Sequence, residues 1–217
     1  MKKIAFLAAA AAASLSFGSA ATAAVYLNKD LITVEVGAGT SPGSFNNTFD
    51  NGQTIEKVID APSADAEEFH NQTTHIWFTA ASLGGGLELV FDFQQSYDIS
   101  TLHFWNYTSE SFDVDQIDFT FFDASYAQVG FLSVFPALGS PGGIEAEDIP
   151  LAAPLNVRYV KAFLTGANRE VDFQNIGFTA EVSAATVPEP ATWALMIAGF
   201  GGAGAMLRRR RTTADLA

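Results

Sequence analysis

Short stretches in which apolar and polar residues alternate constrain the fold of this chain more than any other feature. The clearest stretch places Leu87, Leu89, Phe91 and Phe93 on one parity, with polar residues between several of them. Alternation with a period of two is typical of a β-strand that buries one face. Further segments of the same kind are residues 102–104, 117–121, 158–164 and 176–182.

Clusters of glycine and proline separate these segments, and no long stretch has the spacing of an amphipathic helix. Many short strands with turn signals between them predict an all-β fold, an antiparallel β-sandwich of the jelly-roll kind. The domain predicted in this way spans residues 24–182, and small residues at 183–187 form a linker. Two segments, 60–72 and 136–154, interrupt the pattern and are expected to be long excursions between strands.

The N-terminus has the three parts of a secretory signal peptide. Lys2 and Lys3 form a positive start, residues 4–13 form an apolar run, and Ala21-Thr22-Ala23 is an exit of small residues. The apolar run is too short to cross a bilayer, which takes about 20 residues. We therefore predict that residues 1–23 direct export through the Sec machinery and are then removed.

The C-terminus combines a proline-containing entry, a short apolar run and a basic end. Prolines at 188 and 190 prevent a helix from extending upstream, and Trp193 suits a membrane–water interface. Residues 191–207 are uncharged but rich in glycine, and their length is at the low end for a bilayer span. The arginines that follow should remain on the cytoplasmic side. These features predict a single membrane-spanning helix that acts as a temporary stop.

This end of the chain also resembles a known sorting signal, PEP-CTERM in its PEPxxWA form. The residues that carry the resemblance are Pro188, Glu189, Pro190, Trp193, Ala194, Arg208, Arg209, Arg210 and Arg211. The resemblance covers residues 188–211 and leaves 212–217 as a cytoplasmic tail. It implies a Gram-negative bacterium, processing near Pro-Glu-Pro by an exosortase-type membrane enzyme, and a transient stay in the inner membrane. It also implies the cell surface or extracellular matrix as the destination. The alternative is an ordinary single-pass anchor.

The segment between the two ends is strongly acidic. Of the 24 acidic residues in the chain, only Glu189 and Asp215 lie outside residues 24–187, so that segment holds 22 acidic against five basic residues, a formal net charge of −17. Such a surface lacks the Lys and Arg needed to neutralise phosphates, which excludes nucleic acid as a partner. The chain has no cysteine, so a Cys-ligated zinc or iron–sulfur site is excluded as well.

The order of several short motifs in residues 45–182 is similar to discoidin-type (coagulation factor C-type) domains of the galactose-binding-like superfamily. The motifs are Thr48-Phe49-Asp50-Asn51-Gly52, Val58-Ile59-Asp60, Ile76-Trp77-Phe78, Leu89-Val90-Phe91-Asp92-Phe93, Tyr97-Asp98-Ile99-Ser100, Leu102-His103-Phe104-Trp105-Asn106-Tyr107, Arg158-Tyr159-Val160-Lys161 and Asn175-Ile176-Gly177-Phe178. The resemblance implies an eight-stranded jelly roll that binds sugars or other ligands through loops at one end. The segment between Asp60 and Trp77 looks longer than in the family.

Sugar binding uses an aromatic face that stacks on the sugar's C–H surface, together with polar groups for the hydroxyls. The candidates in this sequence are Trp77, Tyr107, Asn106 and Arg169. Trp105 is aromatic too, but it lies inside a predicted strand, which favours a place in the core.

The resemblance also implies a structural calcium ion. Calcium takes six to eight oxygen ligands from carboxylates, amides and backbone carbonyls. By resemblance the candidate ligands are Asp50, Asn51, Asp60 and Glu181. The alternative for the first two is an ordinary turn, because Asp-Asn-Gly is a common turn sequence.

The sequence favours a protein without catalytic activity. It has no Gly-x-Ser-x-Gly elbow, and its three histidines lack the His-Glu-x-x-His spacing of zinc proteases. His70 and His75 are the one pair that could hold a metal. Glycoside hydrolysis needs two opposed carboxylates, and among 22 acidic residues the sequence nominates no pair.

Taken together, these features predict an exported cell-surface or extracellular-matrix protein whose domain binds carbohydrate, such as exopolysaccharide. The rival prediction is a structural matrix or biofilm protein that recognises no specific glycan. A secreted hydrolase is the third class.

Overall fold

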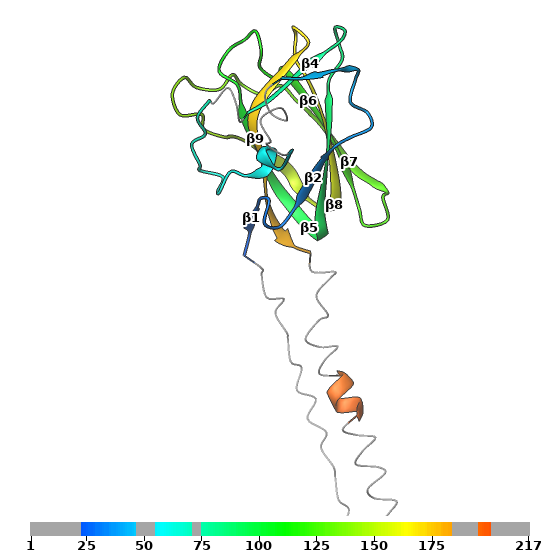
Figure 1. Cartoon of the computed structure of the whole chain (residues 1–217). Helices are drawn as coiled ribbons and strands as arrows, with labels where there is room; N and C mark the ends of the chain where they lie inside the picture. Colours follow the sequence, from blue (N-terminus) through cyan, green and yellow to red (C-terminus); the bar gives the residue numbers. More distant parts are fainter. Residues whose placement is uncertain (1–22, 47–54, 71–74, 184–194, 201–217) are drawn as a thin grey trace, which may run out of the picture. The chain divides into compact units, whose positions relative to one another are not determined.

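The computed structural model of the chain describes residues 23–46, 55–70, 75–183 and 195–200 (Figure 1). The described part of residues 23–183 consists of strands and one short 3-10 helix. In chain order these elements are β1 (Val25–Leu27), β2 (Thr33–Val36), β3 (Gly43–Phe45), η1 (Ile55–Ile59), β4 (Ile76–Ala80), β5 (Leu87–Asn106), β6 (Gln116–Phe122), β7 (Gln128–Val134), β8 (Glu147–Thr165) and β9 (Glu170–Val182). The predicted all-β fold is therefore confirmed.

Neighbouring strands pair in the antiparallel sense in the order β3-β4-β9-β5-β8-β6-β7. Strand β1 adds to β9, and β2 adds to β5. The long strands β5 and β8 occupy the middle of this order and pair with each other along most of their length. They therefore decide the shape of the whole sheet.

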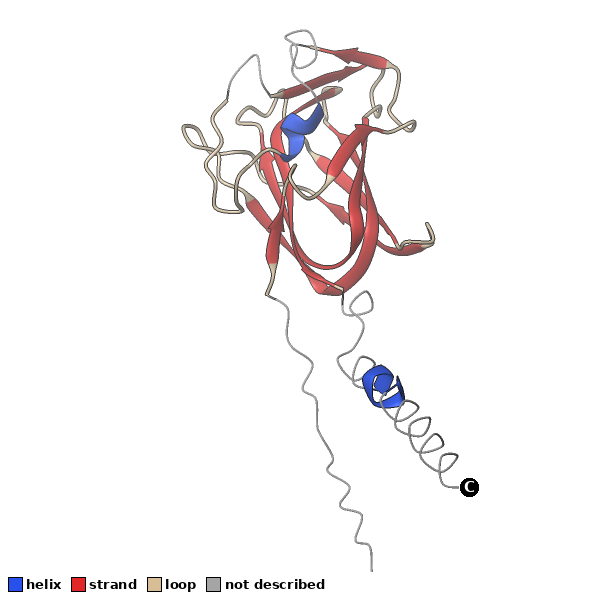
Figure 2. Ribbon diagram, turned by 60° about the horizontal axis from the view of Figure 1, so that its bottom comes forward, coloured by secondary structure: helices blue, strands red, loops and turns tan. Residues whose placement is uncertain are grey.

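Strands β5 and β8 bend back on themselves and so fold one continuous sheet into a sandwich (Figure 2). Leu87, the first residue of β5, pairs with Leu164 near the end of β8. The side chain of Asn106, the last residue of β5, donates a hydrogen bond to the Val114 carbonyl, 3.0 Å away. The next residue, Asp115, donates from its backbone N–H to the last residue of β8. Both ends of β5 and the end of β8 thus meet at one end of the molecule.

One layer of the sandwich contains β1, β3, β4, β9, the second half of β5 and the first half of β8. The other layer contains β2, β6, β7 and the remaining halves of the long strands. The bend in β5 comes at Gln94, whose φ of 61° lies in the left-handed region, between the paired residues Asp92 and Tyr97. The Gln94 N–H is satisfied there by the Asp92 carboxylate at 2.8 Å.

Aromatic rings from both layers fill the core. Phe91 and Phe93 of one layer pack on Phe178 of the other, with ring centroids 5.2 and 5.0 Å apart. Leu87, Leu89, Phe91 and Phe93 are all fully buried, which confirms the burial predicted from their alternation. A core this rich in phenylalanine explains how a domain without cysteine can hold together.

The segment 136–154 differs from its prediction. It was expected to be an excursion, yet residues from Glu147 onward belong to β8 and pair with the second half of β5. Proline is tolerated here because Pro150 pairs with Thr101 beside an irregularity in the register, where a missing N–H costs little. The segment 60–70 is outside the strands, as predicted, and is attached by an isolated bridge between Glu68 and Ile144.

The described domain begins and ends at the same place. In β1, Val25 pairs with Ala180, and β9 ends at Val182, so the chain enters and leaves at one end of the sandwich (Figure 1). The other end of β9 starts at Glu170. The predicted signal peptide and most of the sorting segment lie outside the described residues, apart from 195–200, which are helical. Within the described residues, no helix combines the length and the apolar character that a bilayer span requires.

Candidate ligand-binding site

Two loops and the end of β4 meet at the end of the sandwich that is remote from the chain entry; we call it the loop end. The β5–β6 loop, residues 107–115, is joined to β9 by a hydrogen bond from the Asp172 N–H to the Phe112 carbonyl, 3.0 Å long. The β8–β9 turn, residues 166–169, is joined to β4. The backbone N–H of Ala80, the last residue of β4, donates a hydrogen bond of 2.9 Å to the Arg169 carbonyl. Backbone hydrogen bonds thus tie both loops to the sheet.

An aromatic cluster made of His70, His75, Trp77, Tyr107 and Phe112 lies at the loop end. The imidazole of His75 stacks nearly parallel to Trp77 and to Tyr107, at 6.1 Å from each ring. Phe112 meets both of those rings edge-on, at 6.0 and 6.2 Å, and His70 lies 4.7 Å from His75 and from Tyr107. His75 is fully buried, Trp77 and Tyr107 are half-buried, and Phe112 and His70 are exposed. The cluster therefore has a buried base and an accessible aromatic surface.

Glu170 fixes the position of the Trp77 indole. The indole Nε1 donates to Glu170 Oε2 at 2.8 Å, and the Thr79 hydroxyl donates to the same oxygen at 2.7 Å. The Asn46 amide in turn donates to the Thr79 hydroxyl at 2.7 Å. Both hydrogen bonds to the carboxylate end on Oε2, so Oε1 has no partner among the described residues and can accept one from a ligand.

Two further carboxyl groups lie beneath the aromatic cluster. Asp172 is 2% exposed, and its Oδ1 is 3.2 Å from Nε2 of His75; Asp113 is 5% exposed. Burial raises the pKa of Asp172 to about 6, and the neighbouring His75 opposes part of that shift. Burial also raises the pKa of Asp113 to about 6, with a further contribution from the negative charges of Asp115 and Glu110. Shifted carboxyl groups of this kind are common at functional sites.

These raised pKa values predict that the domain is more stable in mild acid than at neutral pH. A carboxyl group whose pKa is higher in the folded chain holds its proton more tightly there, so its stabilising effect is complete below pH 3.8 and disappears as pH rises through about 6. We expect Asp113 and Asp172 together to change the free energy of unfolding by roughly 1–3 kcal/mol over this range. Urea titrations at a series of pH values measure this change in the free energy of unfolding.

The matched comparison is the double variant Asp113→Asn and Asp172→Asn against the exposed control Asp30→Asn. The other carboxyl groups titrate in all three proteins, so only the difference between them reports on the buried pair. We expect the double variant to lose this part of the pH dependence while the control keeps it. An unchanged pH dependence in the double variant would contradict the assignment.

The structure places the four predicted ligand residues at or near the loop end. Trp77 and Tyr107 belong to the aromatic cluster, and Arg169 is exposed in the β8–β9 turn with a φ of 71°. Asn106 is 2% exposed; its amide donates to the Val114 and Ala137 carbonyls and accepts from the backbone N–H groups of Tyr107 and Val114. The structure therefore gives Asn106 the role of holding the β5–β6 loop in place. Trp105 is fully buried, as its strand position indicated.

The structure does not bring the described members of the predicted calcium site together. Asp50 and Asn51 lie outside the described residues. Asp60 accepts a hydrogen bond from the Lys57 ammonium at 2.9 Å, while Glu181 lies near the far end of β9. The Asn175 amide contacts Asp60 at 3.2 Å, and six residues of strand, roughly 20 Å, separate Asn175 from Glu181. The described residues contain no group of three or more His, Asp or Glu suited to a metal ion. The calcium site stays a prediction.

Sequence reasoning did not single out Phe112, Asp113 or Asp172 as parts of a site. Asp172 alternates with apolar residues in its strand, which is the pattern of a solvent-facing position. Its burial follows from the β5–β6 loop, which covers that face of β9. Phe112 lies in the loop that provides this cover. The one sequence signal for its role is that it is an apolar residue within a polar stretch.

Comparisons with known proteins bear on both parts of the chain. Residues 186–211 match the PEP-CTERM protein-sorting motif. All the predicted motif residues from Pro188 to Arg211 lie inside this match, so the predicted sorting signal is confirmed. Comparison with curated protein sequences gave no match.

Several solved structures resemble the domain. The F5/8 type C domain of a Bacteroides fragilis protein has a TM-score of 0.50 at 6% identity, covering 74% of this chain and 98% of that chain. The C-terminal domain of a B. fragilis chitobiase has a TM-score of 0.49 at 11% identity, covering 73% and 99%. The family 32 carbohydrate-binding module of NanJ from C. perfringens, solved with galactose, has a TM-score of 0.44 at 10% identity, covering 72% and 99%. The first of these confirms the predicted discoidin-type fold.

Proposed function

We propose that the domain is a non-catalytic glycan-binding module that is exported and delivered to the cell surface or extracellular matrix. The observation that carries this proposal is the aromatic cluster at the loop end, where accessible rings lie beside fixed hydrogen-bond acceptors. Trp77, Tyr107 and Phe112 offer apolar faces to the C–H surface of a sugar ring, and Oε1 of Glu170 offers an acceptor to a hydroxyl group. Exopolysaccharide is the ligand class available at the proposed destination.

The position of the carboxyl groups supports binding without catalysis. Glycoside hydrolysis needs two carboxyl groups that face a glycosidic bond across a cleft. Asp113 and Asp172 have the raised pKa values of a general acid, but they are 5% and 2% exposed and lie below the rings. A sugar that rests on Trp77 and Tyr107 would not reach them.

The sorting motif supplies the route of delivery. In this proposal the Sec machinery exports the chain, residues 191–207 hold it in the inner membrane, and an exosortase-type enzyme processes it near Pro188. The domain connects to this segment through Ser183, at the end of the sandwich opposite the aromatic cluster.

Replacing Trp77 by alanine is expected to weaken glycan binding at least about thirtyfold, because a central aromatic contact is worth about 2 kcal/mol or more. Trp77→Phe keeps a ring but loses the hydrogen bond to Glu170, so its loss should be smaller. The measurement is a glycan array followed by calorimetry, with the full chain in a detergent that has no sugar headgroup.

The control is Phe131→Ala, since Phe131 is 59% exposed on β7, outside the aromatic cluster, and its loss should leave glycan affinity unchanged. Thermal melting checks that each variant is folded. If the wild-type protein binds no glycan while its deletion removes the matrix, the structural matrix role is correct instead. Detection of a glycan cleavage product would instead support the third prediction, a secreted hydrolase.

A further inference from the structure

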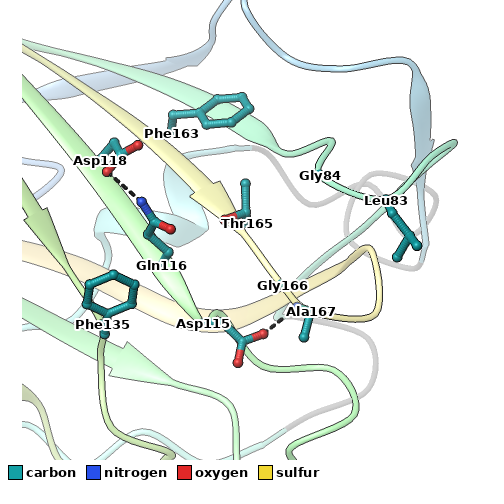
Figure 3. A pocket seen from close by; sticks show the side chains of 10 residues that line it. All are labelled: Leu83, Gly84, Asp115, Gln116, Asp118, Phe135, Phe163, Thr165, Gly166 and Ala167. Carbon is teal, nitrogen blue, oxygen red and sulfur yellow. Dashed lines mark hydrogen bonds between the residues drawn. The ribbon is translucent and has the colours of Figure 1, made fainter.

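A second hollow lies at the loop end, next to the aromatic cluster but lined by other residues. It is an open groove of about 580 Å³ between the β4–β5 connection, β6, the segment after β7 and the end of β8 (Figure 3). Its lining residues are Leu83, Gly84, Asp115, Gln116, Asp118, Phe135, Phe163, Thr165, Gly166 and Ala167. None of the site residues predicted from the sequence lies among them.

The groove carries negative charge with no basic residue among those that line it. Asp118 accepts hydrogen bonds from Gln116 at 3.0 Å and from Ser133 at 2.6 Å, and both end on Oδ1. Asp115 accepts one from the Ala167 N–H on Oδ2. In the part of the chain that the structure describes, Asp118 Oδ2 and Asp115 Oδ1 have no partner. Two carboxylate oxygens are therefore available to a ligand.

Apolar side chains surround this polar floor. Figure 3 shows Phe163, Phe135 and Leu83 around Gln116 and Thr165. Phe135 is 74% exposed and Leu83 is 75% exposed, so both side chains are open to contact with a ligand. The ring faces also attract positive charge.

Carboxylates and aromatic faces around one groove fit a cation with an apolar body better than a bare metal ion. Calcium needs six to eight oxygen ligands, and phenylalanine and leucine supply none. An ammonium group can donate a charge-assisted hydrogen bond to Asp118 while its carbon skeleton packs on Phe135 or Phe163.

The groove and the aromatic cluster share the loops that form them. The β5–β6 loop provides Phe112 to the cluster and ends at Asp115 in the groove. The β8 end and the turn after it provide Gly166 and Ala167 to the groove and lead directly into Glu170. A single extended polymer could therefore contact both, which favours a glycan over an unrelated partner.

We propose that the groove is a second glycan subsite that binds an amine-bearing sugar, with the ammonium group at Asp118 and the ring on Phe135 or Phe163. The inference rests on the proposed glycan-binding function and adds the class of sugar. It requires selectivity for a free amine over the same sugar with its amine acetylated, because acetylation removes the charge.

The experiment is calorimetry with the full chain in a detergent without sugar headgroups, in mildly acidic buffer where the amine is protonated. The probes are a glucosamine oligomer and an N-acetylglucosamine oligomer of the same length. We expect the wild-type protein to bind the glucosamine oligomer about tenfold more tightly, the effect of one hydrogen bond to a charged group. Asp118→Asn should remove this preference, and Asp30→Asn should keep it. Phe135→Ala should weaken glucosamine binding, and Phe131→Ala should not.

Equal affinity for the two oligomers, or a preference that survives in Asp118→Asn, would overturn the subsite while leaving glycan binding at Trp77 intact. If neither oligomer nor any array glycan binds, the glycan-binding function fails, and the subsite fails with it. If an oligolysine peptide binds with the same dependence on Asp118 while no glycan does, the occupant is a polypeptide and the subsite is wrong.

Discussion

Cells that carry alanine in place of Pro188, Glu189 and Pro190 are expected to keep the protein at full length in the membrane fraction. In wild-type cells we expect a shorter form at the surface or in the medium, because the proposed delivery includes processing near these residues, which lie inside the PEP-CTERM match. The expected effect is close to all-or-none, since the variant removes the proposed recognition sequence and leaves the apolar run and the arginines that are predicted to hold the chain in the membrane. Fractionation and the mass of the surface-exposed protein measure the outcome.

The matched control is Thr192→Ala, which changes a position that the PEP-x-x-Trp-Ala pattern leaves open. It should be processed like the wild-type protein. If the wild-type protein itself remains at full length in the membrane, the tail is a simple anchor and the predicted delivery to the matrix is wrong. Because glycan binding is measured on the full chain, that result would leave the ligand proposals standing.

The fold was largely predictable because its strands follow a simple rule. Leu87, Leu89, Phe91 and Phe93 alternate along the chain and are all fully buried, as one face of a sandwich strand requires. Alternation does not show where a strand bends, however. The turn of β5 depends on Gln94 adopting a φ of 61°, a conformation that the sequence of a non-glycine residue does not signal.

The candidate site was predictable only in its aromatic residues. Trp77 and Tyr107 were singled out by residue type, and the fold brings Trp77 from β4 and Tyr107 from the β5–β6 loop to 6.1 Å from His75. Asn106 had the same polar character as a ligand residue, but its four hydrogen bonds to the backbone depend on the path of the following loop. Long-range packing of this kind is absent from local sequence patterns.

Strand β9 shows most clearly where pattern reading fails. Residues 171–178 are buried at every position, including the polar side chains of Asp172, Gln174 and Asn175. A period-two pattern assigns one face of a strand to solvent, yet here other segments cover the outer face as well: the loop end covers Asp172, and residues 60–61 contact Asn175. The buried carboxyl group of Asp172, and the pH dependence expected from it, follow from that second layer of cover.

Gly166 lies close to backbone atoms of both the β8–β9 connection and the β5–β6 loop, and Gly166→Ala is expected to damage both stability and binding. A Cβ atom at this position would lie 1.9 Å from the Glu170 carbonyl oxygen and 2.8 Å from the Asp113 carbonyl oxygen. Both are backbone atoms, so the β8–β9 turn must shift relative to the start of β9 and to the β5–β6 loop. We expect a loss of about 3 kcal/mol in the free energy of unfolding, at the upper end for an overpacked position. Urea denaturation measures it.

Gly84→Ala is the informative comparison, because it places the same methyl group where the structure offers open space. Gly84 has a φ of 77°, so alanine costs about 1–2 kcal/mol in backbone strain there, but nothing lies within 4 Å of the new atom. Gly84 lines the groove and not the aromatic cluster, so Gly84→Ala should lower stability without a large loss of glycan affinity at Trp77. Gly166→Ala should lower both, since moving the β8–β9 turn shifts Glu170 away from Trp77 and Ala167 away from Asp115. If Gly166→Ala keeps wild-type affinity, the β8–β9 turn does not hold the ligand site together, and the aromatic cluster must bind through β4 and the β5–β6 loop alone.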